Sequence, residues 1–158
     1  MKILEGTYLA QDFRFGIVVS KFNGLITSRL LDSALETFKK GGASDHHIQI
    51  VRVPGAFEIP LVARQLAVTR QFDAILCLGS VIRGETAHFD YVCAETSRGI
   101  AQAALDTGVP VIFGVLTTET VDQALERSGP PQRNRAVHAA QAAMEMASLM
   151  KQIRTLEA

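Results

Sequence analysis

The residue types that could carry chemistry gather in one short segment, Arg83-Gly84-Glu85-Thr86, and in His88, which follows it. A glycine, a hydroxyl and successive backbone N–H groups ahead of a helix are typical of an anion-binding loop. The imidazole of His88 could move protons beside a bound anion, because imidazole both accepts and donates a proton near neutral pH. A simpler interpretation stays open, since Gly and Thr also serve turn geometry and a His can cap or pack at a helix start.

Three arginines, Arg127, Arg133 and Arg135, surround a Pro-Pro turn near the carboxyl end of the chain. A guanidinium can hold a phosphate with two parallel hydrogen bonds, so at least one of them is a candidate phosphate ligand. Arg127 also has a structural explanation, because a cation in the last turn of a helix interacts favourably with the helix dipole.

Two further candidates follow predicted strands. Phe22, beside Asn23, is either a stacking platform for a planar ring or an ordinary core residue. Glu58 either complements the dipole of the helix that it begins or accepts hydrogen bonds from ligand hydroxyls.

Several other chemistries have no support in the sequence. There is no His, Cys or Asp cluster with metal-ligand spacing, no P-loop and no Ser in a nucleophile elbow, so the residues themselves indicate no metal site. Cys77 and Cys93 lie within apolar segments, and we interpret them as buried, reduced thiols. We interpret His46 and His47 as solvent-exposed.

Length and composition indicate one domain, residues 1–158, with a sizeable core. Hydrophobic residues make up 47% of the chain, and 16 Lys and Arg balance 16 Asp and Glu. This neutral balance argues against nucleic acid or an anionic membrane as a partner. The longest apolar runs are too short to span a bilayer, and the N-terminus does not resemble a signal peptide, so we expect a cytoplasmic protein.

Apolar strands alternate with helices along the chain. We expect strands at residues 13–20, 48–53, 74–78 and 109–116, and helices at 27–40, from about 57, 89–106, 118–128 and 134–153, with Thr118 or Thr120 as a cap. Continuous apolar strands separated by helices predict a three-layer, doubly wound α/β sandwich around a four-stranded parallel sheet. In such a sheet ligands bind at the carboxyl ends of the strands, where the candidate residues lie.

Residues 2–8 are also strand-like, but no crossover helix would place them parallel within the same sheet. Two interpretations stay open. The segment either adds to the sheet of a neighbouring subunit, which would indicate an oligomer, or forms an ordinary fifth strand.

Read together, the loops resemble the 6,7-dimethyl-8-ribityllumazine synthase family. The resemblance rests on Phe22-Asn23, residues 53–60 (VPGAFEIP), residues 79–92 (GSVIRGETAHFDYV) and residues 113–118 (FGVLTT), and it covers essentially the whole chain. It implies a flavodoxin-like fold and a transferase of riboflavin biosynthesis. That enzyme condenses 5-amino-6-(D-ribitylamino)uracil with 3,4-dihydroxy-2-butanone 4-phosphate to 6,7-dimethyl-8-ribityllumazine, releasing phosphate and water without a cofactor.

The resemblance also implies a role for each matched position. Phe22 would stack on the pyrimidine ring, Glu58 would accept ribityl hydroxyls, and His88 would move protons. Glu85 and Thr86 would bind the phosphate through their backbone N–H groups. The other implied substrate contacts are Asn23, Ala56, Phe57, Ser80, Val81 and Ile82.

In the family, the residues that match Phe113 and Arg127 come from a neighbouring subunit, with the arginine on the phosphate. The resemblance therefore implies a homo-oligomer, a pentamer, and in many members a 60-subunit icosahedral shell, with riboflavin synthase as a further partner. We expect the pentamer and favour its further assembly into the shell.

One segment departs from the family pattern. Where the family usually has Gly-Asn-Lys-Gly, this chain has Arg133-Asn134-Arg135-Ala136, so Arg135 replaces a substrate-contacting Lys. A planar guanidinium differs in geometry from an ammonium, and Pro130-Pro131 should stiffen the turn. Two alternatives to an active enzyme therefore stay open: a catalytically weakened shell-forming or lumazine-binding protein of the same fold, and an unrelated phosphate-binding α/β domain.

Overall fold

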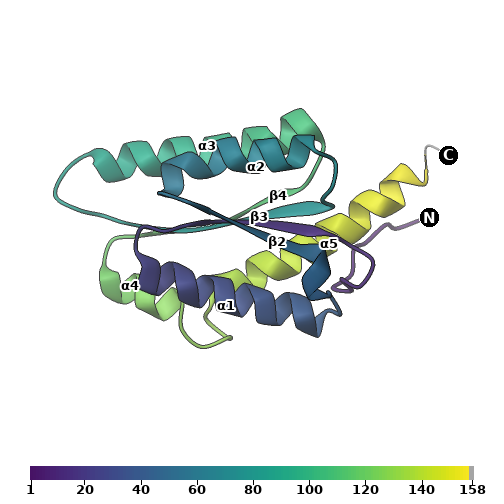
Figure 1. Cartoon of the computed structure of the whole chain (residues 1–158), viewed down its shortest axis with the longest axis horizontal. Coiled ribbons are helices and arrows are strands. Elements are labelled where there is room, and N and C mark those ends of the chain that lie inside the picture. Colours follow the sequence, from purple (N-terminus) through teal and green to yellow (C-terminus); the bar gives the residue numbers. More distant parts are fainter. Residues whose placement is uncertain (157–158) are drawn as a thin grey trace.

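A four-stranded parallel sheet forms the centre of the molecule (Figure 1). The computed structural model describes residues 1–156. The strands lie in the order β2-β1-β3-β4, and each adjacent pair is parallel. Their bounds are β1 (Phe15–Ser20), β2 (Ile48–Val53), β3 (Ala74–Ile82) and β4 (Val111–Thr118). The predicted sheet is confirmed, and all four carboxyl ends lie at one edge.

Helices cover both faces of this sheet (Figure 1). One face packs against α1 (Gly24–Lys40), α4 (Val121–Arg127) and α5 (Arg135–Arg154), and the other against α2 (Ile59–Val68) and α3 (His88–Thr107). Two 3-10 turns, Asp45–His47 and Ala56–Glu58, precede β2 and α2. The predicted three-layer, doubly wound architecture is therefore confirmed. Among residues 1–156, no helix combines the length and the apolar character needed to cross a bilayer.

The sheet separates two apolar cores. On the α1 side, Phe15 stacks against Phe38 with ring centroids 4.4 Å apart, and Ile17 and Val19 join the same cluster. Val18, which alternates with them along β1, belongs to the cluster under α2 and α3. Burying each such side chain contributes about 1.5–3 kcal/mol, so the strands form a firm base for the loops at their ends.

The third strand is longer than predicted. We expected it to end at residue 78, whereas β3 continues to Ile82, which pairs with Thr118 of β4. Gly79 lies inside β3, where close packing leaves little room for a side chain: an added Cβ would lie 3.0 Å from the Ser20 hydroxyl. A glycine directly after the predicted strand end therefore marks a tight approach of β1 to β3 and not the end of the strand.

The other boundaries shift by a few residues. Helix α1 begins at Gly24, before the predicted residue 27, and β4 runs from Val111 to Thr118 rather than over 109–116. Thr120, one of the two predicted caps, accepts a hydrogen bond from the Gln123 N–H (3.1 Å) and caps α4.

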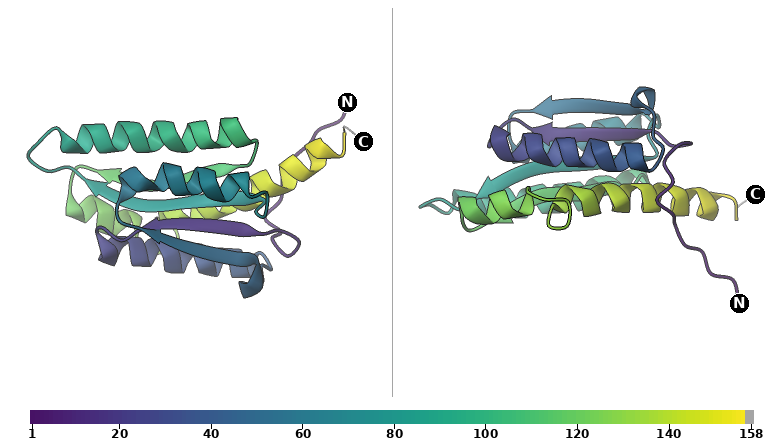
Figure 2. Two further views of the ribbon diagram at one scale, coloured as in Figure 1. Left: turned by 45° about the horizontal axis from the view of Figure 1, so that its top comes forward. Right: turned by 90° about the horizontal axis from the view of Figure 1, so that it is seen from below.

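The N-terminal segment lies along α5 and not at the sheet. The Thr7 N–H donates to the Ser148 hydroxyl (2.7 Å), and the Gln152 amide donates to the Glu5 carbonyl (2.7 Å). In Figure 2 the segment crosses the carboxyl-terminal half of α5, and its first residues extend away from the helix. The alternative of an ordinary fifth strand is wrong, since the sheet has four strands within residues 1–156. Addition to a neighbouring subunit stays a prediction.

The cysteine and histidine expectations are met in part. Both cysteines are free, Cys77 is buried, and Cys93 is only half-buried. Burial raises the pKa of both thiols, and the Asp90 carboxylate adds to the effect at Cys93. His46 is exposed as predicted, whereas His47 is half-buried in the turn before β2, which corrects its expected exposure.

Candidate active site

A cleft of about 720 Å³ opens at the carboxyl ends of the strands. It lies beside β1 and β3, the adjacent strands at which the strand order reverses, and such a switch point is the usual binding crevice of an open α/β sheet. Most of the predicted site residues line this cleft: Phe22, Ala56, Phe57, Glu58, Ser80, Val81, Ile82, Thr86 and His88.

The turn after β1 holds the phenyl ring of Phe22 out of the core. Asn23 adopts the left-handed conformation (φ 57°), which Asn tolerates better than most residues. Its side-chain amide donates to the Ser80 carbonyl (2.8 Å), so the turn is attached to the end of β3. Phe22 is 70% exposed and lines the cleft, which excludes the interpretation of an ordinary core residue.

The segment after β2 forms the neighbouring wall. The Phe22 N–H donates to the Pro54 carbonyl (3.1 Å), which joins the first two loops. In the following 3-10 turn Ala56 is buried, whereas Phe57 is 59% exposed and presents a second aromatic ring. Glu58 lies at the N-terminus of α2 and also lines the cleft, so its carboxylate is available both to the helix dipole and to a ligand.

The loop between β3 and α3 contains several backbone N–H groups without a partner in residues 1–156, and we call its residues 84–87 the donor loop. Within the described chain, the backbone N–H groups of residues 84–87 donate to no other protein group. They lie immediately before the N-terminus of α3, where the helix dipole favours negative charge. The predicted anion-binding character of this loop therefore has a concrete geometric basis.

His88 is the first residue of α3, as predicted for a residue at a helix start. Its backbone N–H donates to the Thr86 hydroxyl (3.3 Å), so the contact of His88 with this turn is made by its backbone and not by its imidazole. Its side chain is exposed and lines the cleft, and within residues 1–156 it forms no hydrogen bond or ion pair. An imidazole in this position can exchange protons with a ligand beside the donor loop.

Five predicted residues do not line the cleft of their own chain. Asn23 lies next to it and supports it through Ser80, and Glu85 is exposed on the donor loop. The other three are Phe113 on β4, Arg127 in the last turn of α4 and Arg135 at the start of α5.

Some cleft residues were missed by our sequence reasoning. These are Pro54, Gly55, Phe89, Tyr91 and Val92, whereas Gly84, which also lines the cleft, belongs to the predicted anion-binding loop. A signal for two of them was present, because Tyr91 and Val92 follow His88 at helical spacings of three and four residues and therefore share its face of α3.

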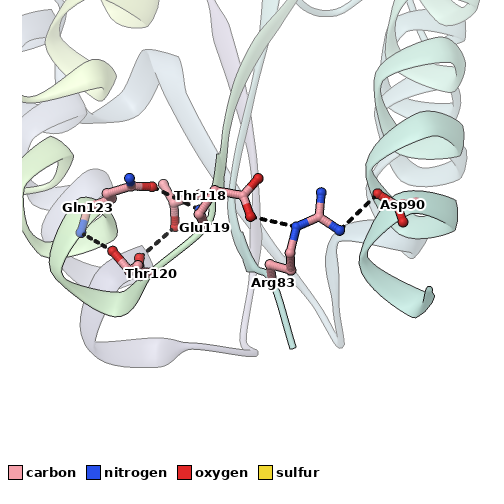
Figure 3. A network of polar contacts seen from close by, with 6 residues as sticks. All are labelled: Arg83, Asp90, Thr118, Glu119, Thr120 and Gln123. Carbon is pink, nitrogen blue, oxygen red and sulfur yellow. Dashed lines mark hydrogen bonds and ion pairs between the residues drawn. The ribbon is translucent and has the colours of Figure 1, made fainter. Parts of the chain in front are cut away.

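An ionic network lies behind the donor loop (Figure 3). The Arg83 guanidinium reaches the Glu119 carboxylate (2.5 Å) after β4 and the Asp90 carboxylate (3.2 Å) in the first turn of α3. The hydrogen bond to Glu119 raises the pKa of Arg83 further above its ordinary value, so the guanidinium keeps its charge. The sequence predicts Arg83 as part of the anion-binding motif but does not indicate its carboxylate partners.

Comparison with known proteins identifies the relatives of this chain. The family model described as 6,7-dimethyl-8-ribityllumazine synthase matches residues 12–151. A protein of that name from Syntrophus aciditrophicus (strain SB) is 56% identical over 96% of this chain and 98% of its own length. Another, from Desulfatibacillum aliphaticivorans, is 50% identical over 97% of this chain and 99% of its own length. With this fold, this cleft and these relatives, the chain belongs to the 6,7-dimethyl-8-ribityllumazine synthase family.

Proposed function

We propose that this protein is the transferase of riboflavin biosynthesis that condenses 5-amino-6-(D-ribitylamino)uracil with 3,4-dihydroxy-2-butanone 4-phosphate to 6,7-dimethyl-8-ribityllumazine. The observation that carries the proposal is one cleft that combines an exposed aromatic platform, a donor loop and a free imidazole, in a member of this family. Its nearly full-length relatives are named for this activity.

The reaction needs proton transfers and a site for phosphate more than a covalent nucleophile. The 5-amino group attacks the ketone, and water leaves as the imine forms. Loss of the proton at C3 then expels phosphate from C4, and the resulting enol becomes a ketone. The ribitylamino nitrogen attacks that ketone, and a second water leaves as the ring closes. Orientation of the two substrates and a group that shuttles protons can supply this catalysis.

The lining residues suit these tasks. Phe22 is the platform for the planar pyrimidine, and Glu58 accepts hydrogen bonds from the ribityl hydroxyls. The free N–H groups of residues 84–87, including those of Glu85 and Thr86, hold the phosphate at the N-terminus of α3. His88, next to that loop, carries protons to and from the reacting atoms. Ala56, Phe57, Ser80, Val81 and Ile82 shape the pocket around the ring, and Asn23 supports it.

Phe113, Arg127 and Arg135 complete the cleft of a neighbouring subunit in this proposal. Phe113 is 43% exposed on its own chain, although it lies on a strand of the central sheet. Arg135 is exposed at the N-terminus of α5, where a cation is disfavoured by the helix dipole, so its own helix gives no reason for the charge. The functional unit is then a homo-oligomer, a pentamer, in which each chain is one domain over residues 1–158. We expect it in the cytoplasm.

The test is incubation of the purified protein with both substrates while the fluorescence of the lumazine and the release of phosphate are followed. Equal amounts of both products, formed faster than in a protein-free reaction, are the expected result. A chelator should leave the rate unchanged, since no step uses a metal. A rate equal to the spontaneous background would contradict the proposal and favour a catalytically weakened, lumazine-binding protein. Fluorescence titration with the lumazine would then identify that alternative.

A further inference from the structure

Arg83 touches both ends of the donor loop at once. The residue precedes the loop, and its side chain extends to the two residues that follow His88. Its guanidinium carbon lies 4.3 Å from the centre of the Phe89 ring, and the Asp90 carboxylate is 3.2 Å from its Nη1. Nε donates to Glu119, which follows β4 (Figure 3). One planar group thereby joins the end of β3, the start of α3 and the end of β4.

We propose that Arg83 is a positioning residue for the condensation: it holds residues 84–88 in the shape that presents their N–H groups and the His88 imidazole to the phosphate-bearing substrate. The inference rests on the function proposed above and adds to it a residue outside the cleft that supports the loop.

The loop has little else to hold it. Residues 84–88 are exposed, and the N–H groups of residues 84–87 bind no protein acceptor within the described chain. Its fixed points are the Arg83 N–H, which donates to the Thr118 carbonyl (2.9 Å), and the first turn of α3. Fixing a loop residue in one conformation is opposed by its conformational entropy, and a loop that is ordered beforehand does not lose that entropy when the substrate binds.

The anchor on the far side is itself fixed. The Glu119 backbone N–H donates to the Gln123 side chain (2.9 Å), and the Gln123 N–H donates to the Thr120 hydroxyl (3.1 Å) at the cap of α4. Figure 3 shows this capping arrangement on one side of Arg83 and Asp90 on the other. The carboxylate that holds Arg83 is therefore carried by a capped helix start.

Arginine is suited to this position for reasons of shape. Its planar guanidinium can stack on an aromatic face and still direct N–H groups in its plane to two carboxylates. A lysine ammonium has no plane to stack and binds as a point charge. Arg83 itself does not line the cleft, so it supports the loop and is not a substrate contact.

The network is too exposed to carry much of the stability of the fold. The Arg83 side chain is 38% exposed and both carboxylate side chains are 59% exposed, and such ion pairs contribute little to unfolding free energies. Removing Arg83 should therefore change how the loop binds phosphate, with little effect on folding.

The experiment compares Arg83→Ala, Arg83→Lys and Glu119→Gln with the full-length wild-type enzyme. For Arg83→Ala we expect the KM for the butanone phosphate to rise about tenfold and kcat to fall, because the loop is no longer preorganised. The KM for the ribitylaminouracil should stay within about twofold, since Phe22 and Glu58 lie on other loops. Arg83→Lys and Glu119→Gln should have smaller effects in the same direction. Arg83→Ala/Glu119→Gln should be no worse than Arg83→Ala alone, because both changes break one network.

The matched control is Arg98→Ala, which removes another exposed arginine that forms an ion pair. Arg98 lies on α3 and pairs with Glu95 (2.6 Å), away from the loop. Its kinetic constants should equal those of the wild type. An equal rise in both KM values for Arg83→Ala, unchanged kinetics, or loss of its circular dichroism spectrum would each overturn the inference.

A second measurement separates this inference from the proposed function. Inorganic phosphate is titrated calorimetrically into the wild type, Arg83→Ala and Arg98→Ala, with no turnover required. Weaker phosphate binding by Arg83→Ala alone is the expected result, and equal binding by all three proteins would overturn the inference. If the wild type binds phosphate but makes no lumazine, the proposed function is contradicted. The phosphate titration still tests the role of Arg83, because it does not depend on turnover.

Discussion

At the scale of single residues, the His88 side chain is the one whose removal should affect catalysis without affecting the fold. This side chain is exposed at the first position of α3 and forms no hydrogen bond or ion pair within residues 1–156. We therefore expect His88→Ala to leave the circular dichroism spectrum unchanged and to lower kcat about 10²-fold, the low end of what a general acid or base supplies. His46→Ala, at an exposed histidine before β2, is the matched control. Turnover of His88→Ala equal to that of the control would exclude a role in proton transfer.

Arg127 should affect one substrate more than the other. It is half-buried in the last turn of α4, where Nη1 donates to the Gln123 carbonyl (3.3 Å), a contact of modest strength. We expect Arg127→Ala to raise the KM for the butanone phosphate at least about tenfold, because a guanidinium ligand of the phosphate is lost. The KM for the ribitylaminouracil should change little. Arg98→Ala, which removes an exposed ion pair with Glu95 (2.6 Å), is the control. Equal weakening of both substrates would instead indicate a role in folding or in subunit contacts.

The site residues that could be predicted are those whose positions follow from the chain order of strand, loop and helix. Phe22, Glu58 and His88 each follow a strand of a parallel sheet, so the rule on strand ends brings them together. The network around Arg83 could not be predicted in this way. Its partners Asp90 and Glu119 lie in different loops, and which carboxylate an arginine reaches depends on side-chain geometry that spacing does not determine.

At the scale of elements, Asn134 connects three parts of the chain. Its side-chain oxygen accepts from the Ala136 N–H (2.9 Å) and caps α5, and its amide nitrogen donates to the Ser33 hydroxyl on α1 (2.9 Å) and to the Gly129 carbonyl (3.1 Å). Asn134 and Ala136 are fully buried, whereas Ser33 and Gly129 are half-buried. Removing the side chain would therefore leave the Ala136 N–H without a partner. Asn134 holds the turn that contains Pro130-Pro131 between two helices.

We expect Asn134→Ala to lower the free energy of unfolding by about 2–3 kcal/mol, the combined effect of a lost cap and of two further hydrogen bonds lost from part-buried positions. Urea unfolding at a fixed protein concentration measures it, since assembly contributes to apparent stability. Thr120→Ala, which removes an exposed cap of the short helix α4, should lose only about 1 kcal/mol. Equal losses for the two variants would mean that the contacts of Asn134 with α1 and the turn contribute nothing.

Element types could be predicted more reliably than element ends. The order of strands and helices follows from apolar runs and helical periodicity, and it is confirmed. The end of β3 was missed because continued pairing with β4, a tertiary effect, extends a strand through Gly79. For the N-terminal segment, the alternative of a fifth strand is wrong because within one chain its hydrogen bonds go to α5. Its strand-like pattern still allows pairing with a neighbouring subunit, which stays a prediction.

At the scale of the whole molecule, several apolar side chains of one chain have no cover. Leu61 on α2 is 66% exposed, and Tyr91 and Leu105 on α3 are 70% and 81% exposed. Both helices lie on the same face of the sheet (Figure 1). Large apolar side chains that are exposed on one layer are typical of a surface that another protein chain covers, and Tyr91 also lines the cleft.

We expect assembly with further copies of the chain to cover this face and to complete the cleft. A monomer would lack the Phe113 and Arg127 that the proposed mechanism takes from the next chain, and a closed ring of identical subunits supplies them to every site. We expect a pentamer, five times the 17.1 kDa of one chain, as the smallest active species. Asn134 holds the turn that contains Pro130-Pro131 between α1 and α5. We expect this turn to set the angle for further assembly, and we expect pentamers to close into a shell of sixty chains. Sedimentation velocity and light scattering on the untagged protein measure both steps. A species of five chains alone would exclude the shell, and an active monomer would contradict the shared site itself.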